Sequence, residues 1–387
     1  MTQPLQNRTN GGPVERLMGW WRRRSKGASH AKHKKRKATR EDFVKYAYEI
    51  AAAAEIEGDP EKMHRCTYKL IRLELYERAW DLRVRAAALK QPSPLPEWDG
   101  SDLAGRTILV RAYTPRKRVG EELRMARFIA PMAAQAGRCI VLAEPRLVPI
   151  LGRSFPETEV RPRGIDDAAA FAEADVAAYY ETIGLHTVKT GEDMRRAFVL
   201  LKADPDRVAA IRQRYLEGSS GPLLGISWGS SNGDKVVPDL QSWAAVLGWP
   251  GAKFVSLQYG NIDSDLAVLQ ELSDGRVILD TDIDQMADLD GFAAQIAALD
   301  GVISISNTTI DVAGMLGVPT AHIRDDNLSS AIWPRTGPSP WYPDMIFVYR
   351  EHRPWSEVLA EARTHLEKAI ARPAPAGNPP RDSSARF

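Results

Sequence analysis

Short apolar segments alternate with helical segments between residues 107 and 323, and this alternation limits the possible folds more than any other feature of the sequence. Buried strands that are separated by helices pair in parallel, with the helices covering both faces of the sheet. The pattern therefore predicts an α/β protein with two Rossmann-like, doubly wound domains in tandem. The predicted strands are 107–112, 138–142, 175–180, 223–228, 253–257, 277–279, 301–306 and 320–323.

The boundary between the two domains is placed where the alternation pauses. A helix predicted over 206–216 ends at a Gly-Ser-Ser-Gly stretch, so we place the first domain at 92–220, the second at 221–350 and a terminal helix at 351–370. Tandem domains of this kind usually hold a site in the cleft at the carboxyl ends of their strands. Further helices are predicted over 121–136, 145–151, 241–247, 263–272, 289–299 and 310–316.

Residues 41–91 have a different, wholly helical pattern. Apolar residues recur at helical spacing on both sides of the sequence Gly58-Asp59-Pro60, which breaks the helix. The segment resembles a reduced tetratricopeptide-like unit made of helical hairpins. The proline-rich stretch 91–96 is predicted to be a stiff linker to the α/β domains.

Charge is divided unevenly along the chain. The formal net charge is +2, yet residues 1–40 contain 12 Lys and Arg and one acid, a charge of +11, and the remainder carries 40 bases and 49 acids, a charge of −9. We predict a disordered basic tail at 1–40 and a second disordered tail at 371–387. The acidic body argues against specific nucleic-acid binding, which requires a basic face.

Two tryptophans precede an arginine run in the basic tail, from Trp20 to Arg24. Aromatic rings beside basic side chains suit an anionic membrane surface or an acidic partner, and the alternative is a charged tail surrounded by solvent. The two cysteines, Cys66 and Cys139, provide no disulfide framework, and no apolar run approaches the ~18 residues of a membrane span. We expect a cytoplasmic protein. The basic tail offers a way to attach it peripherally to the inner face of the membrane.

The segment 304–320 is the strongest candidate for binding an anion. A buried strand ends in polar residues, a helix begins, and a glycine ends it. The amino terminus of a helix offers free N–H groups and the positive end of its dipole, which together favour a phosphate or diphosphate. Thr308 and Thr309 would add hydroxyl donors, and Asp311 would accept hydrogen bonds from a ribose. The alternative is that Asn307 or Thr308 caps the helix and Asp311 complements its dipole.

Two further turns carry side chains that suit a catalytic or a phosphate-binding role. Glu121 follows the first strand, where its carboxylate would point into the cleft as a general base. The alternative is an ordinary acid in the first turn of a helix. The loop from Ser227 to Lys235 would hold phosphate with backbone N–H groups and an ammonium, or is a plain Gly/Ser loop.

The alternating acids Asp280, Asp282 and Asp284 invite a metal interpretation, which we reject because the acids continue beyond them and Asp288 is expected to cap the next helix. The seven histidines show no ligand pairing, and the sequence contains no GxGxxG fingerprint, P-loop or serine-nucleophile signature. We therefore expect no metal and no organic cofactor.

Five further motifs follow one another along the chain. They are WDG…LAGRT at 98–107, VGEELRMARF at 119–128, FVSLQYG at 254–260, the run 298–319 and PWYP at 340–343. In this collinear order, between residues 68 and 370, they resemble the bacterial tetratricopeptide-linked glycosyltransferase-like proteins. That family is similar to the GT-B glycosyltransferases, among them heptosyltransferases and the protein O-linked N-acetylglucosamine transferase. The resemblance implies a GT-B fold and a nucleotide-sugar donor held mainly by the second domain, without a metal.

The resemblance also gives each candidate residue a role. Glu121 would deprotonate the acceptor hydroxyl, and it replaces an aspartate of the family. Asn307 replaces a histidine of the family motif. The donor contacts would come from Ser227, Lys235, Gln258, Tyr259, Asn307, Thr308, Thr309 and Asp311.

Two functions follow from these observations. The first is a glycosyltransferase that moves a sugar from a nucleotide sugar to a hydroxyl acceptor, for which the resemblance favours a protein. The alternative is a catalytically inactive binding or scaffold protein on a GT-B fold, which would use the basic tail and the helical segment to hold a partner or a membrane.

Overall fold

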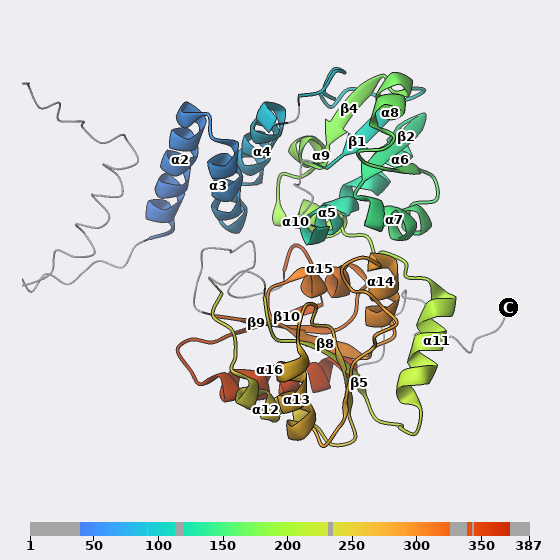
Figure 1. The fold of residues 1–387 in the computed structure, drawn as a ribbon. Helices are drawn as coiled ribbons and strands as arrows, with labels where there is room; N and C mark the ends of the chain where they lie inside the picture. Colours follow the sequence, from blue (N-terminus) through green and yellow to red (C-terminus); the bar gives the residue numbers. More distant parts are fainter. Residues whose placement is uncertain are drawn as a thin grey trace, which may run out of the picture. The chain divides into compact units, whose positions relative to one another are not determined.

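The computed structural model describes residues 39–90, 92–112, 119–230, 235–325, 339–342 and 344–371. Contacts divide the chain into two compact units, Met1–Pro92 and Ser93–Phe387 (Figure 1). The tails predicted at 1–40 and 371–387 lie almost entirely outside the described residues, so their disorder stays a prediction.

The described part of the first unit consists of the helices α2 (Arg40–Glu57), α3 (Pro60–Arg72) and α4 (Tyr76–Lys90). The predicted helix break is confirmed. Gly58 ends α2 with a left-handed φ of 63°, and the Asp59 carboxylate caps α3 by accepting two backbone N–H groups of its first turn. Leu70 and Trp80 are fully buried in the core of this unit. The likeness to a tetratricopeptide unit stays a prediction.

The first sheet of the second unit has four parallel strands in the order β3-β2-β1-β4. These strands are β1 (Thr107–Arg111), β2 (Arg138–Ala143), β3 (Glu159–Pro162) and β4 (Val176–Tyr179). Strands β1, β2 and β4 confirm the prediction. The sequence pattern misses β3 because charged residues alternate with apolar ones in this partly buried edge strand, so it contains no apolar run.

The helices of the first sheet differ from the prediction more than its strands do. The single helix expected over 121–136 is divided into α5 (Val119–Met125), a 3₁₀ turn η1 (Ala126–Phe128) and α6 (Ile129–Gln135). Pro131 lacks the N–H that a continuous helix would need, which interrupts the regular hydrogen bonding. The other helices are η2 (Pro145–Leu147), α7 (Val148–Ser154), α8 (Asp167–Glu173), α9 (Tyr180–Thr187), α10 (Gly191–Arg196) and α11 (Pro205–Leu216).

The second sheet has six parallel strands in the order β10-β9-β8-β5-β6-β7. They are β5 (Leu223–Ser227), β6 (Lys253–Ser256), β7 (Val277–Ile278), β8 (Gly301–Ser304), β9 (Thr320–Arg324) and β10 (Met345–Tyr349). The first five confirm the prediction. Strand β10 is not predicted, although its sequence Met-Ile-Phe-Val-Tyr is a continuous apolar run, because no helical segment was recognised between it and β9.

The helices of this sheet surround an apolar core that includes Trp243, Phe254 and Leu359. They are η3 (Leu240–Trp243), α12 (Ala244–Leu247), α13 (Asp263–Leu272), α14 (Leu289–Ala297), α15 (Thr308–Met315) and α16 (Trp355–Ile370). Asp288 caps α14, as predicted, by accepting the N–H of Gly291 at 2.8 Å. None of the helices among the described residues combines the length and the apolarity needed to cross a membrane.

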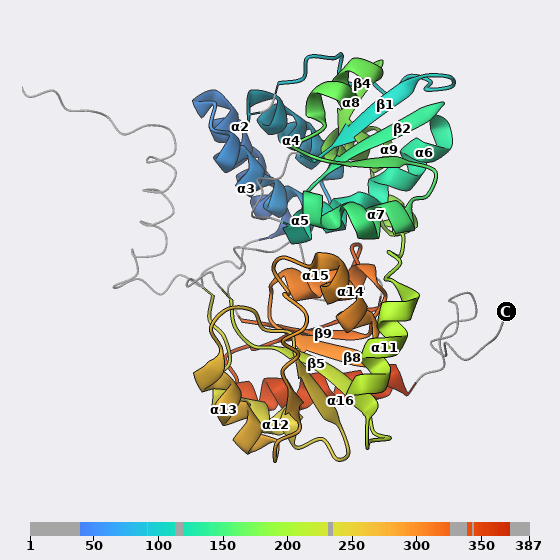
Figure 2. The ribbon, with the colours of Figure 1, turned by 45° about the vertical axis from the view of Figure 1, so that its right-hand side comes forward.

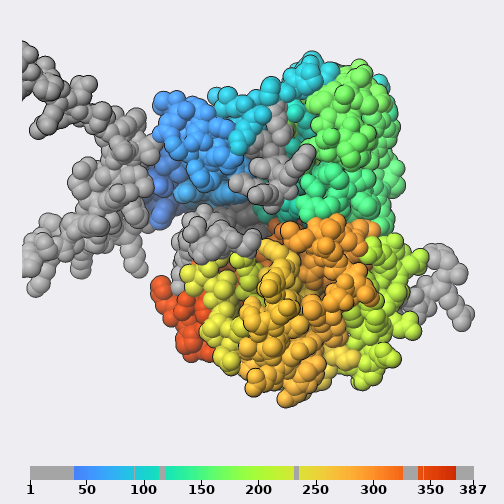
Figure 3. Space-filling model, viewed as in Figure 1, coloured from blue at the N-terminus to red at the C-terminus, as the bar shows by residue number. Residues whose placement is uncertain are grey.

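The carboxyl ends of the two sheets face each other within the second unit. Both ribbon views place α14 and α15 between the six-stranded sheet and the half of the unit that contains α5 and α7 (Figures 1 and 2). Helix α5 follows β1, α15 follows β8, and the two helices are in contact. In the space-filling view, orange atoms from the region around residue 300 lie directly against green atoms of the first half (Figure 3).

Candidate functional site

The amino terminus of α15 is capped by a side chain that the sequence analysis selected. Asn307 has an extended backbone, and its Oδ1 accepts the N–H of Thr309 at 3.1 Å. Thr308 is partly exposed and Thr309 is buried, and both belong to the first turn. The capping alternative for Asn307 is therefore confirmed. A cap does not exclude a ligand, because the remaining N–H groups of the first turn still point beyond the helix end.

Asn307 also joins two other candidate residues. Its Nδ2 donates to Ser227 Oγ at 2.6 Å, and Ser227 Oγ donates to Gln258 Oε1 at 3.0 Å. The same Gln258 oxygen accepts the backbone N–H groups of Trp228 at 3.1 Å and Gly229 at 2.7 Å. This chain of hydrogen bonds fixes the start of the loop after β5 against the start of α15.

Cationic side chains meet beside the same helix end, around Ser306. Lys235 Nζ donates to the Ser306 carbonyl oxygen. Arg324, the last residue of β9, places Nη1 3.5 Å from Ser306 Oγ, and His322 Nε2 lies 2.7 Å from that oxygen. Burial and then the nearby guanidinium of Arg324 lower the pKa of Lys235. Burial, followed by Arg324, Lys235 and Arg124, holds the pKa of His322 well below its ordinary value, so this imidazole is neutral.

Asp311 has a position that the sequence analysis did not anticipate. Its carboxylate forms a two-pronged ion pair with Arg124 of α5, with Nε–Oδ1 at 3.0 Å and Nη2–Oδ2 at 3.2 Å. The Tyr342 hydroxyl donates to Oδ1 at 2.7 Å. Burial lowers the pKa of Arg124, but the carboxylate of Asp311 outweighs it and raises that pKa. The carboxylate expected to bind a ribose therefore pairs, in this structure, with the other half of the unit.

Helix α5 brings the candidate base close to this ion pair. A Cβ added to Gly120 would lie 2.4 Å from Asp311 Oδ2, so the backbone of α5 reaches the first turn of α15 only because residue 120 has no side chain. Glu121 follows directly and is 6% exposed. The structure thus brings the helix of Glu121 to the helix that begins at Thr308. Residues 113–118, which precede this turn, lie outside the described residues.

The neighbouring Glu122 has a structural role instead. Its Oε1 accepts the backbone N–H of Glu144 at 2.8 Å, and its Oε2 pairs with Arg163 at 2.9 Å. Glu122 is 1% exposed, and this burial raises the pKa of its carboxyl despite the opposing effect of Arg163. Glu122 therefore ties the start of α5 to the ends of β2 and β3, and so fixes the position of Glu121.

Replacing Glu122 by glutamine is expected to lower the free energy of unfolding by about 1–3 kcal/mol, because the charge-assisted bond to Arg163 is lost in a buried place. Urea unfolding measures this difference. Glu192→Gln, at an exposed pair with Arg195, is the matched control and should leave stability almost unchanged. Equal losses in the two variants would contradict the anchoring role of Glu122.

Of the remaining candidates, Tyr259 is partly buried and follows β6 by three positions. Residues 231–234 of the predicted phosphate loop lie outside the described residues.

Three residues that contact the candidate site were not predicted from the sequence: Arg124, Arg324 and Tyr342. Arg324 immediately follows the predicted strand 320–323. Its position at the carboxyl end of a strand could therefore have marked it as a candidate site residue. Nothing in the local sequence indicates the pairing of Arg124 with Asp311.

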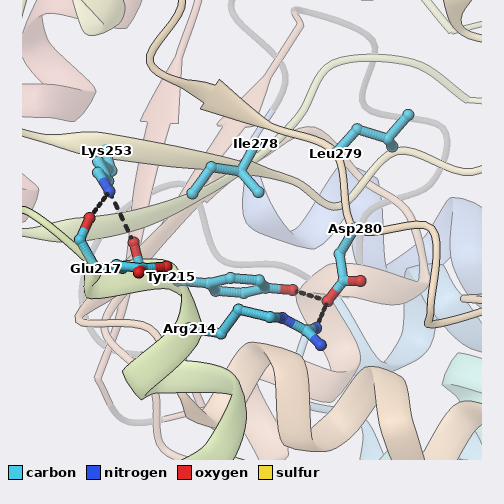
Figure 4. Close-up of a pocket in the computed structure, with 7 residues that line it drawn as sticks. All are labelled: Arg214, Tyr215, Glu217, Lys253, Ile278, Leu279 and Asp280. Carbon is cyan, nitrogen blue, oxygen red and sulfur yellow. Dashed lines mark hydrogen bonds and ion pairs between the residues drawn. The ribbon is translucent and has the colours of Figure 1, made fainter.

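A surface pocket of about 470 Å³ lies elsewhere, at the β7 edge of the second sheet (Figure 4). Its polar groups are already bonded to one another. Arg214 and the Tyr215 hydroxyl both bond the Asp280 carboxylate, and Lys253 Nζ donates to the carbonyl oxygens of Tyr215 at 3.1 Å and Glu217 at 2.6 Å. Strands β5 and β6 separate β7 from β8, so this pocket is distinct from the α15 site.

The described residues include no group of three or more His, Cys, Asp or Glu side chains placed to hold a metal ion. The acids that invited a metal interpretation have other partners. Asp280 and Asp282 both pair with Arg214, and Asp284 accepts the backbone N–H groups of the two residues Met286 and Ala287 at 2.9 Å each.

Comparison with known proteins finds one curated relative and several solved structures with a similar fold. Protein FlbA of Caulobacter vibrioides is 30% identical over 299 residues, covering 72% of this chain and 49% of FlbA. The chain thus spans about half the length of that relative. No protein-family model matches the chain.

Two solved structures show which fold this is. The glycosyl transferase family 9 protein of Veillonella parvula superposes with a TM-score of 0.50 at 12% identity, covering 71% of this chain and 99% of that one. The ADP-heptose LPS heptosyltransferase II of E. coli gives a TM-score of 0.50 at 14% identity, covering 68% of this chain and 100% of that one. The fold is therefore that of the GT-B glycosyltransferases, as predicted.

Proposed function

We propose that this protein is a glycosyltransferase that transfers a sugar from a nucleotide-sugar donor to a hydroxyl acceptor. One observation carries the proposal. The helix that bears Glu121 packs against α15, whose amino terminus adjoins the Lys235 ammonium. A carboxylate and an anion site on opposing sheet ends are the two parts that such a transfer requires.

The chemistry assigns one task to each part. Glu121 accepts the proton of the acceptor hydroxyl while that oxygen attacks the anomeric carbon. The bond from this carbon to the donor phosphate breaks, and its electrons stay on the phosphate oxygen. Lys235 and the first-turn N–H groups of α15 stabilise that charge, the task that a metal performs in other transferases. Inverted stereochemistry is what the resemblance to GT-B enzymes implies.

Donor binding tests the proposal directly. Saturation with the correct nucleotide sugar at about 100 times its Kd should stabilise the protein by about 2.7 kcal/mol, which a thermal-shift screen of nucleotide sugars detects. Lys235→Met should weaken that binding by about 10- to 100-fold, because one charge-assisted hydrogen bond to phosphate is lost.

Lys253→Met is the matched control for Lys235→Met. Lys253 also donates to backbone carbonyl oxygens, but to those of Tyr215 and Glu217 at the carboxyl end of α11, in the pocket of Figure 4. Donor affinity should be unchanged in this variant. A screen in which no nucleotide sugar raises the unfolding temperature, or an equal loss in both variants, would contradict the donor site.

A protein acceptor and a cytoplasmic location with peripheral membrane contact through the basic tail belong to the same proposal. The residues 1–38 that would make this contact lie outside the described residues. Removing residues 1–38 should leave donor binding intact and change only the association with a membrane or partner.

The second candidate is a binding or scaffold protein without catalytic activity. The observation that favours it is the Arg124–Asp311 ion pair, which occupies the carboxylate that would bind the donor ribose. Under this alternative, purified protein would not hydrolyse or transfer from any nucleotide sugar that it binds.

A further inference from the structure

One face of α2 carries an exposed apolar stripe. Tyr48, Ala52 and Ile56 follow one another at intervals of four positions, which places them on the same side of the helix. The buried residues Ala47 and Ala54 lie on the opposite side. Tyr48 is 44% exposed, Ile56 is 82% exposed, and Ala52 is exposed as well. The described residues therefore leave this stripe open to solvent.

The position of α2 makes the stripe unusual. Helix α3 contacts both α2 and α4, so α2 lies at one end of the described helical array (Figures 1 and 2). The terminal helix of a stacked array normally presents a polar outer face, because no further helix packs on it. The apolar stripe on α2 therefore points to a further segment that covers it.

The chain contains such a segment shortly before α2, within residues 1–38, which lie outside the described residues. Its apolar residues recur at i, i+3, i+4 and i+7, and they are Val14, Leu17, Met18 and Trp21. This spacing is typical of the apolar face of an amphipathic helix. Pro13 suits the first position of such a helix, and the arginines 22–24 suit its last turn. The sequence thus predicts that residues 13–24 can form an amphipathic helix.

A helix this short needs a surface on which to fold. Isolated helices shorter than about 12–15 residues are marginal in water, and Gly19 weakens this one further. The dimensions of the two apolar faces match. Seven positions separate Val14 from Trp21, about 10 Å along a helix, and eight positions separate Tyr48 from Ile56, about 12 Å.

The connection between the two segments favours contact within one chain. Residues 25–38 join the predicted helix to Thr39, the amino-terminal cap of α2. A link of this length lets the two helices pack antiparallel, and it keeps the segment at an effective concentration on the order of 1 mM near the stripe. A weak contact is then enough to hold the segment in place.

Charge favours the same antiparallel arrangement. It brings the arginines 22–24 beside the first turns of α2, where Glu41 and Glu49 are exposed on the side of the stripe. These two acids outnumber the single base of that face, Lys45. The dipoles of two antiparallel helices also oppose each other favourably.

We propose that residues 13–24 fold into a helix that packs antiparallel on the stripe of Tyr48, Ala52 and Ile56, and so cap the helical unit from within the same chain. This proposal concerns the helical unit alone and does not depend on the donor site. Packing buries the Trp21 indole against α2. The side chain of Trp20 points about 100° away from that of Trp21 and lies off the packed face.

The reactivity of a thiol at position 52 tests this packing in the full chain. Ala52→Cys places a thiol in the middle of the stripe, and alkylation by a maleimide, followed by mass spectrometry, measures how often that thiol is accessible. The native Cys66 and Cys139 are buried, and burial raises the pKa of both thiols, so they react slowly.

Adding Trp21→Glu to Ala52→Cys should accelerate alkylation about 10-fold. A contact with a Kd of about 100 µM is about 90% occupied at an effective concentration of about 1 mM, and the glutamate abolishes it. Trp20→Glu is the matched control, because it makes the same replacement off the packed face, and it should leave the rate almost unchanged. Arg65→Cys places an exposed thiol on α3. Its reactivity should be the same with and without Trp21→Glu if the helical unit stays folded.

Each other outcome would overturn the proposal. Alkylation of Ala52→Cys at the same rate with and without Trp21→Glu would show that the segment does not cover the stripe. Equal acceleration by Trp20→Glu and Trp21→Glu would show that no defined helix face packs there. Protection that disappears on dilution would assign the stripe to a second copy of the chain. Protection that requires anionic phospholipid vesicles would assign the segment to a membrane surface.

Discussion

Replacing Arg124 by methionine is expected to lower the free energy of unfolding of the protein by about 3–5 kcal/mol, which is the usual cost of removing one partner of a buried ion pair. The Asp311 carboxylate would stay buried with its hydrogen bond from Tyr342 but without its cation. The side chains of Arg124 and Asp311 are only 12% and 8% exposed, so solvent can replace little of what is lost. Urea unfolding, followed by circular dichroism, measures the change.

The control for Arg124→Met is Arg138→Met, which breaks an Arg–carboxylate cluster in the same unit at 38% exposure. Exposed pairs contribute little, so this variant should lose far less stability than Arg124→Met. The double variant Arg124→Met/Asp311→Asn should be less unstable than the two single changes added together, because no uncompensated charge remains. Strict additivity would show that the two side chains do not act as a pair.

The strands show what the sequence alone could predict. Eight of the strands carry continuous apolar runs because both faces of a parallel sheet are covered by helices, and such runs are visible without tertiary information. Strands β3 and β10 lie at the sheet edges, where one side meets solvent or a loop. Strand β3 has the sequence Glu-Val-Arg-Pro, so the same criterion cannot detect it. Strand β10 has the apolar sequence Met-Ile-Phe-Val-Tyr and meets the criterion, so its omission was avoidable.

Some features of the candidate site could be predicted from the sequence and others could not. Asn307 and Ser227 were selected from their positions at strand ends, and the structure joins them directly, because Asn307 Nδ2 donates to Ser227 Oγ, which in turn donates to Gln258. The pairing of Asp311 with Arg124 links residues 187 positions apart, and local sequence gives no information on such a contact. An acid in the first turn of a helix is equally consistent with a ribose ligand, a dipole partner and an ion pair, so only the packing of α5 on α15 distinguishes them.

The ion pair also affects how a donor could bind. A ribose that used Asp311 would have to displace the Arg124 guanidinium, whereas the proposed phosphate contact at Lys235 needs no such change. Under the proposed function, the donor phosphate would therefore bind without breaking the Arg124–Asp311 ion pair.

Replacing Glu121 by glutamine is expected to lower the rate of sugar transfer by about 10²- to 10⁴-fold while leaving the affinity for the nucleotide sugar unchanged. The amide has nearly the same shape as the carboxylate but cannot accept the proton of the acceptor hydroxyl. Transfer or donor hydrolysis measured at saturating donor reports the rate, and calorimetry reports the affinity.

Glu121→Asp is the control that separates chemistry from packing. It retains a carboxylate on a shorter side chain, and the glycosyltransferase family that this sequence resembles has aspartate at this position. Glu121→Asp should therefore keep much more activity than Glu121→Gln, although both remove contacts of a residue that is 6% exposed. Similar losses in both variants would show that Glu121 serves to place α5 against α15 rather than to accept a proton. Full activity in Glu121→Gln would remove the residue from the mechanism altogether.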